Sequence, residues 1–136
     1  MVFDADDPKH AIAEERLRTE PVIWLTTVQA SGQPQTSPVW FIWDGAVVRI
    51  LSMPGAGKVR NLRANPRVAL NLDGNKLGGE IVSLEGSGEL AEDEPAGEDY
   101  LTKYDEAIRS LGSNRDEFTG AYSTLVRVRL TRVRVY

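Results

Sequence analysis

The chain of 136 residues has no cysteine and only one histidine, His10, and these two shortages exclude several kinds of chemistry. Without cysteine it can form no disulfide, thiolate zinc site or thiol nucleophile. A single histidine excludes a cluster of histidine metal ligands and a relay between two histidines. We therefore expect no metal site, a cytoplasmic location, and a surface or interface position for His10 rather than a catalytic one.

Long apolar runs are also missing, because no stretch approaches the roughly 18 residues that a membrane span needs. The first residues, MVFDADD, are acidic and lack the basic region of a signal peptide. With 16 Lys and Arg against 20 Asp and Glu, the net charge is −4, which disfavours attraction of the whole surface to nucleic acid or anionic membranes. We expect neither as a partner, so any anion site must be local.

The length and the 41% hydrophobic content are those of one domain with one core, so a single domain is expected over residues 1–136. Asp7 can cap a helix that has Pro8 at its first position, which predicts a helix over about 8–19. Composition and helical spacing predict three more helices, the last capped by Ser113, at 58–65, 93–112 and 113–118.

Six runs of β-branched, aromatic or alternating residues predict strands at 22–28, 34–43, 46–52, 67–73, 82–90 and 125–136. The first two form a hairpin, and Asp44-Gly45 predicts a tight turn into the third. Pro38 cannot donate to a sheet ladder, so its strand should be interrupted or lie at an edge. Six strands with short connections favour a closed or nearly closed antiparallel barrel.

The last strand changes the side on which its apolar residues fall. Three of them share one parity and two take the other: Val126, Val128 and Leu130, then Val133 and Val135. A β-bulge near Thr131 would turn all five toward one core. The same bulge would place Arg127, Arg129, Arg132 and Arg134 together on the opposite face.

The stretch RILSMPGAGKVRNLRANPRV (49–68) runs from a strand through a loop and a short basic helix to the next strand. Gly55 and Gly57 allow a tight turn, and Lys58 and Arg60 add two cations beside the first amides of the helix. This combination predicts a local phosphate site. The alternative is a solvated helix whose cations offset nearby acids. Neither Walker A spacing nor GxGxxG is present, which excludes the P-loop and Rossmann interpretations.

The stretch QTSPVWFIW (35–43) combines small polar residues with aromatic ones. Backbone groups exposed around Pro38 could bond a planar ligand. We interpret Trp43 as a core or dimer-interface residue. For Trp40 both that interpretation and a role at a ligand remain open.

Taken in order, these features resemble the FMN-binding split β-barrel superfamily of pyridoxamine 5′-phosphate oxidase-like proteins, over about residues 12–135. Within it the chain is most similar to the actinobacterial PPOX-class enzymes that use the deazaflavin coenzyme F420. The resemblance rests on four stretches: WLTTVQASGQPQTSPVWFIWDG, KVRNLRANPRVALNLDG, SLEGSGEL and YSTLVRVRLTRVRV.

The resemblance implies a mainly β protein with short helices, a six-stranded antiparallel split β-barrel that forms a homodimer with two cofactor sites at the subunit interface. Three groups of residues match the family's cofactor site: Thr36, Ser37, Pro38, Val39 and Trp40 along the ring system, Leu51 and Ser52 before the phosphate loop, and Lys58 and Arg60 at the phosphate, with Val59 and Asn61 in the same helical turn. The FMN oxidases end that loop with Ser-Arg-Lys, whereas this sequence has Ala56-Gly57-Lys58, which favours F420 over FMN.

By the same resemblance, the chain is expected to transfer a hydride from reduced F420 to a small conjugated or quinone-like acceptor. Because a deazaflavin carries the hydride, the protein supplies binding, orientation and a shielded face, and no catalytic residue is assigned. Arg63, Arg67 and the C-terminal arginines could meet the oligoglutamate tail that F420 has and FMN lacks. The alternatives are an FMN-dependent oxidase or reductase, and a non-catalytic dimer that binds a flavin, a deazaflavin or heme.

Overall fold

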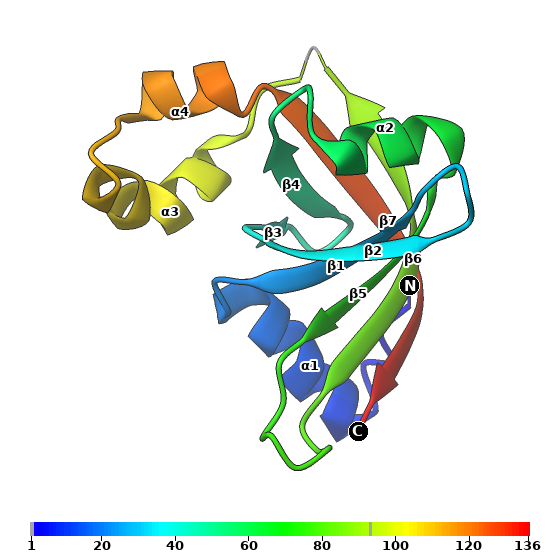
Figure 1. The fold of residues 1–136 in the computed structure, drawn as a ribbon. Helices are drawn as coiled ribbons and strands as arrows, with labels where there is room; N and C mark the ends of the chain where they lie inside the picture. The colour runs from blue at the N-terminus through cyan, green and yellow to red at the C-terminus, as the bar shows by residue number, and fades with distance from the viewer. Residues whose placement is uncertain (1, 93) are drawn as a thin grey trace.

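A computed structural model describes residues 2–92 and 94–136 and shows one curled antiparallel sheet with four helices (Figure 1). The strands are β1 (Ile23–Val28), β2 (Pro34–Val39), β3 (Ile42–Trp43), β4 (Val48–Ser52), β5 (Arg67–Leu72), β6 (Val82–Ala91) and β7 (Thr124–Val135). The helices are α1 (Pro8–Thr19), α2 (Gly57–Ala64), α3 (Glu98–Ser110) and α4 (Arg115–Ala121). No helix in the described ranges is both long enough and apolar enough to cross a membrane.

The sheet runs in the order β2-β1-β5-β6-β7-β4-β3, so its two edges, β2 and β3, come from one continuous stretch of chain. The expected strand over 34–43 leaves one edge after Val39 and joins the other at Ile42. This division explains why the sheet has seven strands and not six. Pro38 lies on edge strand β2, which pairs only with β1, as its missing amide hydrogen predicts. The expected class, a mainly β split barrel with short helices, is confirmed.

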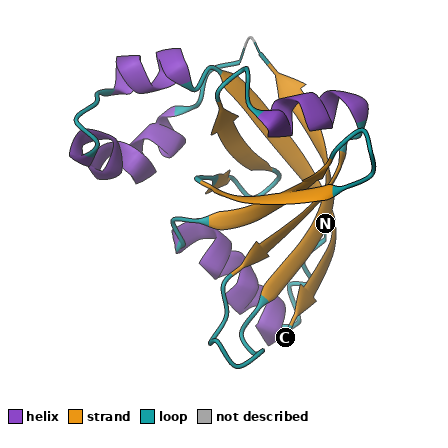
Figure 2. Ribbon diagram, viewed as in Figure 1, coloured by secondary structure: helices purple, strands orange, loops and turns teal. Residues whose placement is uncertain are grey.

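The main core fills the inside of the curled sheet, and a helix covers each of its two ends (Figure 2). Ala13 and Leu17 of α1 are fully buried against it, and Leu62 of α2 packs from the other end. Apolar side chains from every strand complete it, among them Ile23, Leu25, Leu70, Leu84 and Val128. Burial of this kind is the main stabilising contribution to a domain of this size.

The bulge predicted near Thr131 is present. Glu85 pairs with Arg132 and the next residue, Gly86, pairs with Leu130, so Thr131 is the extra residue on β7. Its hydroxyl donates a hydrogen bond to the carbonyl of Glu85 at 3.2 Å. As expected, the apolar residues on both sides of the bulge contact the main core, with Val133 and Val135 partly buried against it.

The four helices lie where the sequence predicts them, and only some of their ends differ. Helix α1 has the expected bounds and the Asp7 cap, whose carboxylate accepts from the amide of Lys9 at 2.9 Å. Helix α2 begins and ends one residue early, and α3 begins later than expected; Asp93, the first residue of that expected range, lies outside the described residues. The cap of α4 is Asn114 and not Ser113, because the Asn114 side chain accepts from the amide of Glu117.

Helices α3 and α4 form a pair outside the sheet with a second, smaller core. Tyr100, Tyr104, Ile108 and Phe118 pack there against Ile42, Leu51 and Leu125 of the sheet. Arg49 of β4 fastens the start of the pair, since it donates to the carbonyl of Ala96 at 2.7 Å and pairs with Asp99. The helical pair therefore stands beside the sheet edge at which the chain crosses from β2 to β3.

Candidate functional site

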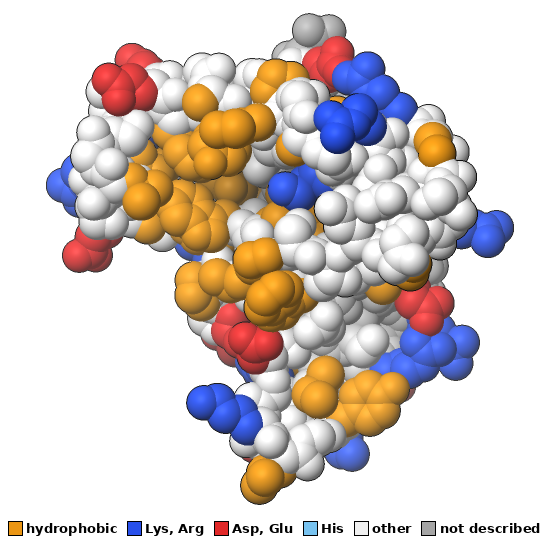
Figure 3. Space-filling view, viewed as in Figure 1, with side chains coloured by type: hydrophobic (Ala, Val, Ile, Leu, Met, Phe, Trp, Pro, Cys, Tyr) orange, Lys and Arg blue, Asp and Glu red, His pale blue; other side chains and the backbone are white. Residues whose placement is uncertain are grey.

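A cleft of about 400 Å³ lies between the helical pair and the sheet. Its lining comes from the residue before β1, from β2 and the residue after it, from β4, from the start of α2, and from the helical pair with the residues that follow its two helices: Val22, Pro38, Val39, Trp40, Leu51, Lys58, Tyr100, Leu111, Phe118 and Tyr122. Figure 3 shows apolar side chains gathered over α3 and α4 on one side of this hollow. Five of the eleven predicted cofactor residues, Pro38, Val39, Trp40, Leu51 and Lys58, meet in it.

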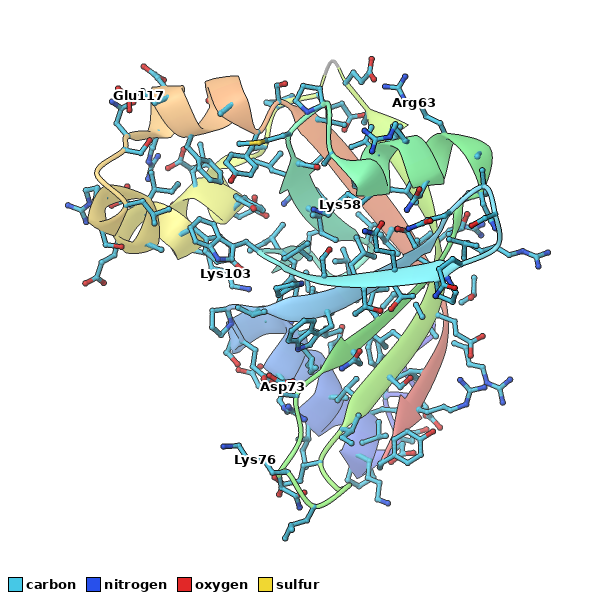
Figure 4. All side chains as sticks on the ribbon, in the orientation of Figure 1. Lys58, Arg63, Asp73, Lys76, Lys103 and Glu117 are labelled. Carbon is cyan, nitrogen blue, oxygen red and sulfur yellow. The ribbon has the colours of Figure 1, made fainter. Side chains whose placement is uncertain are left out.

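Lys58 is the one charged side chain among the described residues that line the cleft, and Figure 4 shows it between α2 and the sheet. It is half-buried, and burial lowers the pKa of its ammonium group below the ordinary value of 10.5. No acidic residue in the described part of the chain forms an ion pair with it. An anion that entered the cleft would restore the interactions that this ammonium group loses on burial.

Lys58 is the second residue of α2, whose first turn contains no acidic residue. Ala56, the residue before the helix, forms no side-chain cap, so the first amides receive no carboxylate or hydroxyl from the cap position. Arg60 is exposed, lies outside the cleft lining, and donates to the carbonyl of Gly55 at 2.8 Å. Arg60 therefore fastens the loop before α2, and its contact with a phosphate stays a prediction.

The other two predicted residues of α2 face inward. Val59 is buried, and the amide of the Asn61 side chain donates to the hydroxyl of Thr27 at 3.0 Å and to the Gln35 side chain at 3.4 Å. These contacts hold α2 against β1 and β2. In this arrangement Val59 and Asn61 set the position of the helix and do not line the cleft.

Three predicted residues with hydroxyl or small side chains also lie outside the lining. The hydroxyl of Thr36 is exposed on the outer face of β2 and bonds to that of Thr26 at 2.7 Å. Ser52 is buried at the end of β4 and donates to the carbonyl of Met53. Ser37 is half-buried between Thr36 and Pro38. The structure brings none of these three to the cleft surface.

The two tryptophans near the strand break have different surroundings. Trp43 is buried in the main core, as predicted, and its indole N–H donates to Glu14 at 3.0 Å. Trp40 is half-buried, lines the cleft and stacks on Tyr104 with ring centres 4.6 Å apart and an interplanar angle of 4°. Trp40 thus belongs to the packing of the helical pair and also lines the cleft.

Sequence reasoning missed the contribution of the helical pair to this site. Tyr100 lines the cleft, and Tyr104 holds the backbone beside Trp40. Phe118 and Tyr122 of the next helix complete the wall. The helical spacing of these residues marks an apolar face, but spacing within one helix does not reveal which strand that face will contact.

The remaining candidates lie outside the cleft lining. His10 is on α1, where its Nδ1 atom accepts a hydrogen bond from the amide of Asp4 at 2.9 Å. Three arginines considered for a cofactor tail pair with acidic residues of the same chain: Arg63 with Glu92, Arg127 with Glu94 and Arg134 with Glu85. Within residues 2–92 and 94–136, no group of three or more possible ligands could hold a metal ion.

The curled sheet divided at one strand, with a ligand-sized cleft beside the division, defines a split-barrel protein. The chain belongs to the pyridoxamine 5′-phosphate oxidase family, because the model of that family matches residues 9–136. Members of this family bind flavin or related cofactors. The resemblance seen in the sequence is thereby confirmed at the level of family and fold.

Solved structures extend this comparison. An F420 reductase is 29% identical, covers 88% of this chain and 94% of its own, and superposes with a TM-score of 0.67. The conserved hypothetical protein Rv2991 from Mycobacterium tuberculosis is 23% identical over 98% of this chain and 88% of its own, with a TM-score of 0.72. HutZ, a heme storage protein from Vibrio cholerae, is 18% identical over 92% of both chains, with a TM-score of 0.66. The last two show the fold alone. No curated protein matches the sequence.

Proposed function

We propose that this protein is an oxidoreductase that uses reduced F420 to reduce a small conjugated or quinone-like acceptor. The observation that carries the proposal is the 29% identity to an F420 reductase over nearly the full length of both chains. The cleft supports it, because one half-buried cation stands beside an apolar and aromatic surface. A cofactor with a phosphate arm and a planar ring needs both features.

The residues of the cleft fit such a cofactor. Lys58 and the first amides of α2 would hold the phosphate, while Pro38, Val39 and Trp40 would lie along the ring. When bound in its reduced form, F420 would supply the hydride. The chain's own contribution is to orient the ring, exclude water with its apolar lining, and hold one positive charge at the phosphate end. No proton donor is assigned.

FMN is the alternative cofactor, because it shares the ribityl phosphate arm for which Lys58 is proposed. A non-catalytic heme-binding protein is the alternative from another class. Against it, no histidine or methionine is among the described residues that line the cleft, and Nδ1 of His10 already accepts a hydrogen bond. The proposal also includes the homodimer with shared cofactor sites and the cytoplasmic location expected from the sequence.

Anaerobic turnover tests this proposal. Reduced F420 and a panel of quinones and other conjugated acceptors are mixed with the protein, and the return of the F420 absorbance is followed. We expect oxidation of reduced F420 to be faster with the protein than without it, and the protein to add much less to the rate when reduced FMN replaces reduced F420. Equal rates with and without protein for every acceptor would contradict the proposal. Light scattering on the same samples tests the dimer, which a monomer near 15 kDa with cofactor bound would contradict.

A further inference from the structure

The cleft has a mouth formed by exposed apolar side chains. Leu111, the C-cap residue just after α3, lines the cleft and is 68% exposed, and Val22, just before β1, lines it and is 36% exposed. Isolated exposed leucines need no explanation on a protein surface. Leu111 and Val22 differ from such isolated residues because both belong to the lining of one cleft, and together they make its entrance apolar.

Behind this mouth the wall is a continuous aromatic surface. The rings of Trp40 and Phe118 lie 5.6 Å apart at 25°, and those of Phe118 and Tyr122 lie 4.6 Å apart at 20°. Trp40 also stacks on Tyr104. Stacked rings fixed in this way present a preformed surface to a flat molecule.

The charge in the cleft is as informative as its shape. Lys58 is the one charged side chain in the described lining, and the proposed function assigns it to the cofactor phosphate. The helical side, from Leu111 to Tyr122, then offers an acceptor no cation and no carboxylate. A charged acceptor would lose hydration there without gaining a partner, which disfavours its binding.

We propose that the helical pair is the acceptor side of the site and that it selects an uncharged, planar acceptor with an apolar substituent extending across Leu111 and Val22. This inference rests on the proposed function for the identity of the reductant. In the balanced reaction a quinone gains one hydride and one proton and becomes the quinol, while reduced F420 becomes F420 and provides both hydrogens. Leu111 is a specificity-determining residue in this account.

Binding of three quinones with a common ring tests the inference: one unsubstituted, one with a short alkyl chain and one whose chain ends in a carboxylate. Equilibrium dialysis measures each, with and without F420. We expect the wild-type protein to bind the alkylated quinone roughly ten- to fiftyfold more tightly than the unsubstituted one, since two or three methylenes are buried, and the carboxylated one least. In Leu111→Arg the order of the two substituted quinones should reverse. Leu77→Arg is the matched control, because Leu77 is 90% exposed and lies outside the cleft lining.

The two proposals fail in different ways. If F420 does not bind but the quinone preferences and their reversal are observed, the proposed function is wrong and the apolar acceptor site remains. If F420 binds but Leu111→Arg leaves the preferences unchanged, the inference is wrong. The inference is also wrong if the wild-type protein binds the three quinones equally tightly both with and without F420. A Leu111→Arg variant that becomes monomeric in light scattering but keeps the wild-type order of quinones also overturns the inference, because Leu111 would then act in subunit contact and not in acceptor selection.

Discussion

The hydroxyl of Tyr104 accepts a hydrogen bond from the backbone amide of Phe41 at 2.9 Å, and this contact joins α3 to the point where the sheet divides. Phe41 lies between β2 and β3, is fully buried, and has no sheet partner for its peptide groups. Its carbonyl accepts from the Lys103 ammonium group at 2.9 Å. The one hydrogen of the Tyr104 hydroxyl is shared between the carbonyl of Pro21 at 2.7 Å and that of Phe41 at 3.0 Å. Two neighbouring residues of α3 thus satisfy the peptide groups that the strand break leaves free.

Replacement of this hydroxyl should destabilise the whole domain. Tyr104→Phe leaves the buried Phe41 amide without an acceptor, so we expect the free energy of unfolding to fall by about 1–3 kcal/mol. Tyr122→Phe is the matched control, because the Tyr122 hydroxyl makes no hydrogen bond to any described residue. Urea unfolding of both variants measures the difference. Equal stability of the two would show that water replaces the hydroxyl and that the contact is dispensable.

Lys103 should make stability depend on pH in the alkaline range. Burial is the main cause that lowers the pKa of Lys103, from 10.5 to about 8, with Glu20 acting in the opposite direction. The unfolded chain therefore binds the Lys103 proton more tightly than the folded chain does. Below pH 8 the burial of the charged ammonium group lowers the free energy of unfolding by its full amount, and this cost disappears as the pH approaches 10.5. As the pH rises between these two values, the free energy of unfolding of the wild-type protein should increase by on the order of 1–2 kcal/mol relative to that of Lys103→Met, after allowance for solvent screening.

Unfolding of both proteins at about pH 7 and about pH 10 measures this gain. Lys9→Met serves as control, since Lys9 is exposed on α1 and should follow the wild type. A constant difference between wild type and Lys103→Met across this range would contradict the assignment.

Local signals in the sequence predicted the parts of the fold that depend on neighbouring residues. The Asp7-Pro8 start of α1 and the change of parity that marks the bulge at Thr131 are of this kind, and both are confirmed. The division of the strand at Trp40 was not predicted beyond the interruption that Pro38 suggested, because it depends on hydrogen bonds from α3, more than 60 residues away. The helical wall of the cleft was missed for the same reason.

The predicted cofactor residues show the same contrast between local sequence signals and long-range packing. Lys58 could be singled out because glycines precede it and it begins a helix, and the structure places it in the cleft. Asn61 lies on the same side of α2 but about 4.5 Å further along the helix axis, where its side chain meets Thr27 instead of the cleft. Whether a residue of α2 lines the cleft therefore depended on how the helix packs on the sheet.

Two glycines of β6 should respond differently to alanine. A Cβ atom on Gly86 would lie 2.6 Å from the backbone carbonyl oxygen of Arg129, which cannot move without disturbing the bulge. On Gly88 it would lie 2.8 Å from the end of the Leu62 side chain, which can rotate. We expect Gly86→Ala to lower the free energy of unfolding by about 1–3 kcal/mol and Gly88→Ala by clearly less. Thermal unfolding compares them, and the reverse order would contradict this account of the bulge.

Removal of the Lys58 charge should weaken cofactor binding with little effect on stability. Charge-assisted bonds to phosphate contribute about 1.5–3 kcal/mol each, so Lys58→Ala should reduce affinity for F420 by roughly ten- to a hundredfold. Arg60→Ala should also weaken binding, at least by loosening the loop at Gly55. Lys76→Ala, at the β5–β6 turn, is the control. Fluorescence titration measures all three, and unchanged affinity in both Lys58→Ala and Arg60→Ala would refute the assignment.

The pH dependence of this binding has a definite sign. Only the protonated Lys58 attracts a phosphate, and burial lowers the pKa of Lys58, so affinity should fall with rising pH earlier than for an exposed lysine. In Lys58→Ala this fall should be absent. Titrations at several alkaline pH values compare the two proteins, and parallel curves would mean that Lys58 does not meet the phosphate.

Calorimetric titration of the wild-type protein with F420 and with FMN, each at low and at high salt, tests the central claim most directly. The two cofactors share the arm proposed for Lys58, and only F420 carries an anionic tail that exposed arginines such as Arg67, Arg129 and Arg132 could meet. Exposed ion pairs contribute only about 0–1 kcal/mol each and are screened by salt. We predict that F420 binds more tightly than FMN and that the gap narrows at high salt. Tighter binding of FMN in both conditions would contradict the claim and identify an FMN-dependent enzyme of the same fold.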